Sequence, residues 1–184
     1  MGVPTGSPHY EKGINDEVAY VFSCPGRHEE KAGRPAAAVT GKNLDILIDI
    51  LRSQGVKVPL RVDATVTNAW DKVEYMAATN RSEATEKEIL DLKNLERLYK
   101  EIFHIKRYII SFGDKAYLAV SKLKLADSCK VIRTCHLSMR KLNSIKTDIN
   151  NNPIVRANNK EEGRRNTVKR LEVIARDIIL QLHK

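Results

Sequence analysis

The chain has 184 residues, of which 42% are hydrophobic and 30% charged, and its formal net charge is +9. This length suits one domain with a core of its own, and the absence of any apolar run near 18 residues excludes a membrane-spanning helix. The three cysteines match neither a zinc knuckle nor a CxxC redox pair, so we expect reduced thiols and a cytoplasmic protein.

The first half of the chain predicts a terminal arm, two strands and a helix. Residues 1–12 hold Pro, Gly and Ser where a secretory signal needs an apolar stretch, which favours a flexible arm. Residues 18–23 form an apolar run that stops at a Cys-Pro-Gly turn and is typical of a buried strand. Leu and Ile recur at helical spacing over residues 40–54. Residues 60–67 are rich in β-branched side chains and predict a second strand, with Asn68 at its carboxyl end.

The second half predicts two more strands, each followed by a helix. Residues 85–102 open with a capping box and continue as one long amphipathic helix. Residues 107–112 predict the third strand, and a glycine turn leads into a helix over 114–122. A short fourth strand is expected at 131–134, and apolar spacing predicts the last helix at 171–182.

Alternating strands and helices favour a single α/β domain over residues 1–184. The pattern predicts a three-layer α/β/α fold with a central four-stranded parallel sheet. Such folds place their sites at the carboxyl ends of the strands, so we search the loops that begin at Pro25, Asn68, Gly113 and His136. An Asn-rich segment at 144–160 predicts a mobile loop beside His136.

Positive charge is concentrated late in the chain. Residues 130–170 contain 11 Lys or Arg and 3 Asp or Glu, a net charge of +8. A basic face of this kind indicates a nucleic acid or another polyanion as partner, although a solvated surface has the same composition.

Four segments lie at the ends of predicted strands: Cys24–Pro35 with Gly41–Asp45, Thr67–Asn68, Ser111–Ala116 and His136–Ser138. Together they resemble the active-site motifs of the uracil-DNA glycosylase superfamily. The bacterial and archaeal iron-sulfur type is the closest by motif, and the resemblance covers about residues 18–143. Those iron-sulfur relatives use four cysteines, which this chain lacks, so we expect no metal and no other cofactor.

The resemblance implies a monomeric enzyme that extrudes a nucleotide from DNA and cuts its glycosidic bond. His136 would donate a hydrogen bond to the departing base, and Asn68 would read the base edge. Pro25, Gly26 and Ala36 would contact the base.

The resemblance also implies a DNA-binding loop. Met139 and Leu142 lie where the family's wedge enters the minor groove, and packing of both into the core is the open alternative. The phosphate contacts would come from Arg34, Ser138, Arg140 and Lys141, although Arg34 suits a carboxylate equally well.

Two positions depart from the family pattern. Directly after Pro-Gly, where the family has an acid, this chain has Arg27. We therefore expect Glu29 or Glu30 to take the catalytic role of that acid. The alternative is that both glutamates are solvated loop residues. An aromatic side chain that stacks on uracil is replaced by Ala36. The opened volume leads to the hypothesis that the base is an enlarged pyrimidine, such as the glucosylated hydroxymethylcytosine of phage DNA, excised in antiviral defence.

Other functions remain open at this point. The chain fits a conventional uracil-DNA glycosylase of base excision repair, or a noncatalytic nucleic-acid-binding relative. A nucleotide-processing α/β enzyme is the third alternative, and the lack of a Walker loop or a GxGxxG turn argues against it.

Overall fold

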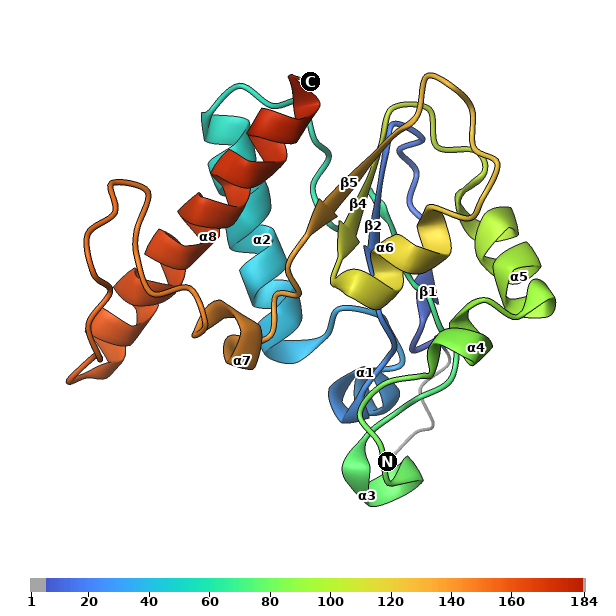
Figure 1. Cartoon of the computed structure of the whole chain (residues 1–184), viewed down its shortest axis with the longest axis horizontal. Coiled ribbons are helices and arrows are strands. Elements are labelled where there is room, and N and C mark those ends of the chain that lie inside the picture. The colour runs from blue at the N-terminus through green and yellow to red at the C-terminus, as the bar shows by residue number, and fades with distance from the viewer. Residues whose placement is uncertain (1–5, 184) are drawn as a thin grey trace.

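A five-stranded mixed sheet forms the centre of the protein in a computed structural model that describes residues 6–183 (Figure 1). The strand order is β1-β3-β2-β4-β5. The last four of these pair in parallel, and β1 runs antiparallel to β3. The bounds are β1 Tyr10–Glu11, β2 Val18–Phe22, β3 Thr65–Asn68, β4 Tyr108–Phe112 and β5 Lys130–Thr134.

The edge strand corrects two predictions. The expected sheet of four parallel strands has a fifth, antiparallel member, and residues 10–11 of the expected flexible arm form it, with Tyr10 opposite Thr67. A strand of two residues is too short to show alternation of apolar and polar side chains, which explains why the sequence pattern missed it. Residues 1–5 of the arm lie outside the described part of the chain.

The side chains of central strand β2 point alternately into two apolar clusters, one on each face of the sheet. All five of its residues are buried. Val18, Tyr20 and Phe22 pack into one cluster, whereas Ala19 and Val21 pack into the other. Because successive side chains point to opposite faces of a strand, helices must cover both faces of the sheet.

Helices do cover both faces. α2 (Ala38–Ser53) and α8 (Lys160–Leu182) contribute to the first apolar cluster, and α5 (Leu92–Ile102) and α6 (Asp114–Val120) contribute to the second. The short helices of the described chain are α1 Arg27–Ala32, α3 Met76–Thr79, α4 Glu86–Ile89 and α7 Met139–Leu142. Within residues 6–183, no helix combines the length and apolar character needed to cross a membrane.

Helix boundaries differ from the prediction where polar side chains cap the backbone. The long helix expected over residues 85–102 is split, because the Asp91 carboxylate accepts hydrogen bonds from the Lys93 and Asn94 amides at 3.0 and 3.4 Å and starts a new helix. α8 begins at Lys160, well before the first residue of the predicted helix, since the Asn159 side chain accepts from the Glu162 amide at 2.9 Å.

Within the predicted Asn-rich loop, residues 147–153 form a hydrogen-bonded hairpin. Thr147 pairs antiparallel with Pro153. The Asp148 carboxylate accepts from the backbone amides of Asn150 and Asn152, both at 2.9 Å. The asparagines therefore close a turn around one buried acid.

Candidate active site

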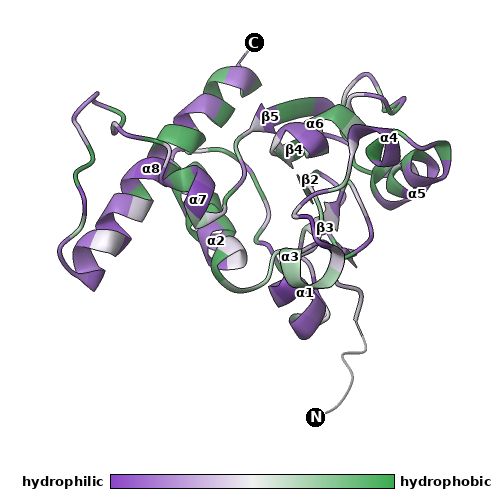
Figure 2. Ribbon diagram, turned by 60° about the horizontal axis from the view of Figure 1, so that its bottom comes forward, coloured by the Kyte–Doolittle hydropathy of each residue, from purple (hydrophilic) through white to green (hydrophobic). Residues whose placement is uncertain are grey.

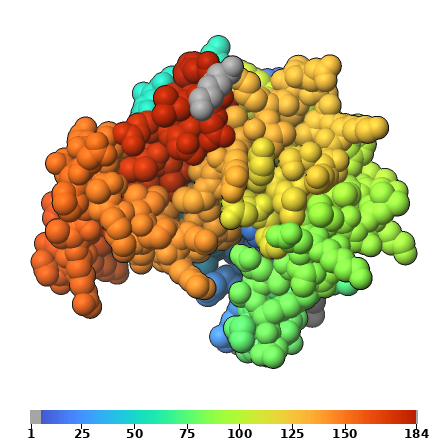
Figure 3. Space-filling view, in the orientation of Figure 1, coloured from blue at the N-terminus to red at the C-terminus, as the bar shows by residue number. Residues whose placement is uncertain are grey.

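A cavity of about 500 Å³ opens at the carboxyl ends of the parallel strands. Figure 3 shows a hollow at this end of the molecule, between the orange surface that includes α7 and the green surface that includes α3. Its volume falls in the range of small-molecule sites. Among the residues expected to form the site, those that line the cavity are Gly26, Glu29, Ala36, Asn68, His136, Ser138, Arg140 and Lys141.

His136 is held at the cavity as a neutral hydrogen-bond donor. The Ser138 backbone N–H donates to His136 Nδ1 at 3.0 Å, so Nδ1 carries no proton and the neutral ring has its proton on Nε2. Burial, together with the smaller effect of the Lys141 charge, lowers the pKa of His136 to about 4. The edge of the ring meets Phe22 at a centroid distance of 5.6 Å. The imidazole is therefore fixed in tautomer and orientation at neutral pH.

Two residues outside the expected set position the His136 loop. Asn43 is buried in α2, and its Nδ2 donates to the Leu137 carbonyl oxygen at 2.8 Å. Gly113 has φ +99°, and a Cβ there would lie 3.2 Å from Ser23 Oγ and 3.6 Å from His136 Cβ. The sequence motif contained both residues, but the contacts join distant segments and no local pattern reveals them.

Asn68 lies at the end of β3 with only 2% of its surface exposed. Its Nδ2 donates to the His9 carbonyl oxygen at 3.2 Å, and Arg97 donates to the Asn68 backbone carbonyl at 3.0 Å. The structure therefore places the amide and His136 in the lining of one cavity, with the amide group held by residues just before β1.

The wall that contains Ala36 has an uncommon backbone conformation. Ala36 and Ala38 have φ values of +45° and +49°, in the left-handed region that L-residues other than Asn and Asp rarely adopt. Gly41 allows this turn, because a Cβ at position 41 would lie 2.1 Å from the Ala36 carbonyl oxygen. Such strain costs about 1–3 kcal/mol per residue and tends to occur at functional sites. The small Ala36 side chain leaves space in the cavity.

The two expected acids have different surroundings. Glu29 lines the cavity, and its two carboxylate oxygens accept from the backbone amides of Gly26 and Ala37, each at 3.0 Å. Glu30 is exposed and accepts a hydrogen bond from the Tyr75 hydroxyl at 2.8 Å. Glu30 does not line the cavity, so the structure brings only Glu29 to the site.

Two further carboxylates that the sequence motifs did not predict line the cavity. Glu74 is buried and accepts from Trp70 Nε1 at 3.0 Å and from Arg81 Nε at 2.8 Å. Its hydrogen bonds to Arg81 lower the pKa of Glu74 to about 2. Glu83 is exposed at the rim. Both follow β3 in a long loop that returns to the cavity, where the Glu74 amide donates to the Pro25 carbonyl at 2.9 Å.

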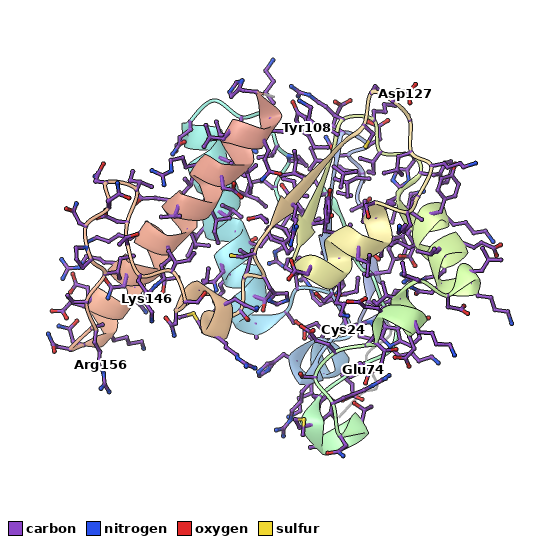
Figure 4. The ribbon with its side chains drawn as sticks, viewed as in Figure 1. Cys24, Glu74, Tyr108, Asp127, Lys146 and Arg156 are labelled. Carbon is purple, nitrogen blue, oxygen red and sulfur yellow. The ribbon has the colours of Figure 1, made fainter. Side chains whose placement is uncertain are left out.

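The cavity also contains a thiol that stays protonated. Burial, followed by the charges of Glu83 and Glu74, raises the pKa of Cys24 to about 12. Figure 4 shows Cys24 and Glu74 at the same end of the molecule. A thiol with this pKa is a poor nucleophile, so Cys24 contributes shape to the cavity and no covalent chemistry.

The expected DNA-binding residues are only partly at the cavity. Ser138, Arg140 and Lys141 line it. Leu142 is fully buried in the first apolar cluster, so its expected role as a wedge is wrong, because the α7 turn points it into the core. Met139 is 37% exposed.

Two other expected site residues lie away from the cavity. The guanidinium of Arg34 lies 3.7 Å from the Glu11 carboxylate, so its partner in the structure is a carboxylate. Pro25 is buried and does not line the cavity.

Substitutions at α7 should separate these two apolar side chains. We expect Leu142→Ala to lower the free energy of unfolding by about 2–5 kcal/mol, because it removes a fully buried side chain. Met139→Ala should change it by about 0.5 kcal/mol or less. Urea unfolding of both variants measures the difference. Equal losses would contradict the assignment of Leu142 to the core.

The sequence matches no protein-family model and no curated protein. Within residues 6–183, no group of three or more His, Cys, Asp or Glu side chains is arranged to hold a metal ion. The functional argument therefore rests on the residues at the cavity.

Proposed function

We propose that the protein is a DNA glycosylase that hydrolyses the glycosidic bond of a flipped-out pyrimidine and leaves an abasic site. The observation that carries this proposal is the neutral His136, with its proton on Nε2, in the same 500 Å³ cavity as Asn68. The proposal includes a three-layer α/β/α fold of the uracil-DNA glycosylase type, a monomeric state and a cytoplasmic location.

The chemistry of the bond explains the need for a neutral donor. When the bond breaks, negative charge develops on the base and positive charge on the sugar. His136 Nε2–H would donate to a carbonyl oxygen of the departing base and stabilise its anion. Because Asn43 and Ser138 already hold the loop, this donor needs no reorganisation during the reaction. Asn68 would contact the base edge with its amide.

Carboxylates around the cavity would serve the sugar and the attacking water. Glu29 is the acid that the sequence and the cavity have in common, and its hydrogen bonds with two amides fix its position. Glu83 also lines the cavity and is the alternative base. Glu74 is ionised and adds negative charge that favours a developing cation, although Arg81 shares that charge.

The substrate in this proposal is an enlarged pyrimidine. Ala36 stands at the wall where related enzymes stack an aromatic ring, and its side chain is too small to close the cavity. The glucosylated hydroxymethylcytosine of phage DNA is one base that would use such space, which would give the protein a role in antiviral defence. Uracil in a repair pathway is the alternative substrate, and a relative that binds nucleic acid without cutting it is the alternative function.

A panel of labelled duplexes tests the proposal. The duplexes carry uracil, a thymine mismatch, hydroxymethylcytosine or its glucosylated form, and alkaline cleavage detects abasic sites. We expect strand breaks at the glucosylated base with the wild-type protein. Breaks at uracil alone would end the enlarged-base proposal but keep the glycosylase, whereas binding without breaks on any duplex would contradict the enzyme.

A further inference from the structure

The first two turns of α8 extend beyond the apolar core of the protein. The buried residues of this helix begin at Thr167, and the stripe that faces the core contains Leu171, Ala175 and Ile178. Toward the helix start, the same face continues at Arg164 and Lys160 by steps of seven and four residues, and both are exposed. In its first two turns, beyond the core, this face of α8 is therefore basic.

The hairpin before α8 lies against this extension and is fixed to it. Asn166 Nδ2 donates to the Val155 carbonyl at 2.8 Å, and Arg170 Nε donates to the Ile145 carbonyl at 3.1 Å. Figure 4 shows Lys146 and Arg156 on this part of the molecule. We call the hairpin and the first two turns of α8, which carry Lys146, Arg156, Lys160 and Arg164, the basic overhang.

The cations of the basic overhang have no acidic partner within the described chain. No carboxylate oxygen of residues 6–183 lies within 4.0 Å of the charged groups of Arg156, Lys160 or Arg164. The nearby acids have other partners. The Glu162 carboxylate accepts from the Asn158 amide, Glu161 lies 4.0 Å from Arg165, and Asp148 closes the hairpin turn. Three cations without a carboxylate partner in this part of the chain favour a polyanion as ligand.

The basic overhang is continuous with the rim of the cavity. α7 lies between them, contacts α8 and contributes Arg140 and Lys141 to the cavity lining. Figure 2 brings this end of the molecule forward and shows hydrophilic residues on the first turns of α8 and on α7. Lys160 and Arg164 are separated by about 6 Å along the helix axis, which is comparable to the distance between neighbouring phosphates of one DNA strand.

We propose that the basic overhang binds the phosphates of double-stranded DNA on one side of the extruded nucleotide. This inference rests on the proposed function, since it places the nucleotide in the cavity. It adds that the protein reads a duplex flank, so that DNA with a long flank on that side binds more tightly than DNA with a short one.

Charge-neutralised variants test the basic overhang. The first variant carries Arg156→Gln, Lys160→Gln and Arg164→Gln. Its matched control carries Lys57→Gln, Lys122→Gln and Lys124→Gln, three exposed lysines away from the cavity. The probes are duplexes with an abasic site and a flank of 6 or 16 base pairs on either side, and fluorescence anisotropy measures binding over a salt series.

We expect the slope of log affinity against log salt to fall by about 2 to 3 in the overhang variant and by less than about 1 in the control. The affinity gained from a long flank should appear on one side only and disappear in the overhang variant. Equal losses in both variants, no loss in the overhang variant, or an equal loss with single-stranded DNA would overturn the inference. Binding that depends on the overhang without any base release would support the inference while contradicting the proposed function.

Discussion

Replacement of His136 by alanine should reduce the rate of base release by about 10²–10³-fold, because it removes one preorganised donor to the leaving base. The variant should still bind duplex DNA, since the cations at the rim remain. Single-turnover kinetics with the most reactive duplex of the panel measures the effect. His183→Ala is the matched control, because His183 is exposed at the end of α8 and does not line the cavity.

The pH dependence of the wild-type reaction gives a second measure of His136. Its pKa of about 4 lies below the ordinary value of 6.5, so the ring is neutral at any pH well above 4. As the pH falls through 4, protonation of Nδ1 removes the acceptor for the Ser138 amide and disturbs the loop. We expect a flat rate between about pH 5.5 and 8. An inflection near pH 6.5 that is lost in His136→Ala would contradict the buried neutral histidine.

Regular apolar patterns could be read from the sequence, and capped or very short elements could not. The continuous apolar run of β2 comes from burial on both faces and the helical spacing in α2 from burial on one face, so the order of apolar residues reveals both elements. Helices of four residues, such as α3 and α7, are about one turn long and have no measurable period. The break at Asp91 depends on a side chain that competes for backbone amides, which periodicity does not register.

Some residues of the candidate site could be predicted from the sequence, and others could not. Asn68 and His136 were predicted from the resemblance to glycosylase motifs and from the rule that parallel strands end at one edge of the sheet, where the topology brings their ends together. Glu74 was missed because its place depends on a long-range hydrogen bond to Pro25 and an ion pair with Arg81. Nothing near Glu74 in the sequence marks the end of a strand.

Glu74→Gln should lower the free energy of unfolding at pH 7 by about 2 kcal/mol, because it removes the charged hydrogen bonds between a buried carboxylate and Arg81, which keeps Glu88 as its other partner. Trp70 can still donate to the new amide oxygen, so the charge is the main loss. Urea unfolding measures the change. Glu83→Gln is the matched control, since Glu83 is exposed and makes no ion pair within residues 6–183, and we expect a change of about 0.5 kcal/mol or less.

The free energies of unfolding of the wild type and Glu74→Gln should become equal at low pH. The pKa of Glu74 in the folded protein is lowered to about 2 from an ordinary 4.5, so its stabilising contribution is complete above pH 4.5 and is lost as the pH falls toward 2. The wild type and Glu74→Gln should therefore differ most at neutral pH and least near pH 2. A difference that does not change with pH would show that Glu74 stabilises the cavity wall by its shape and not by its charge.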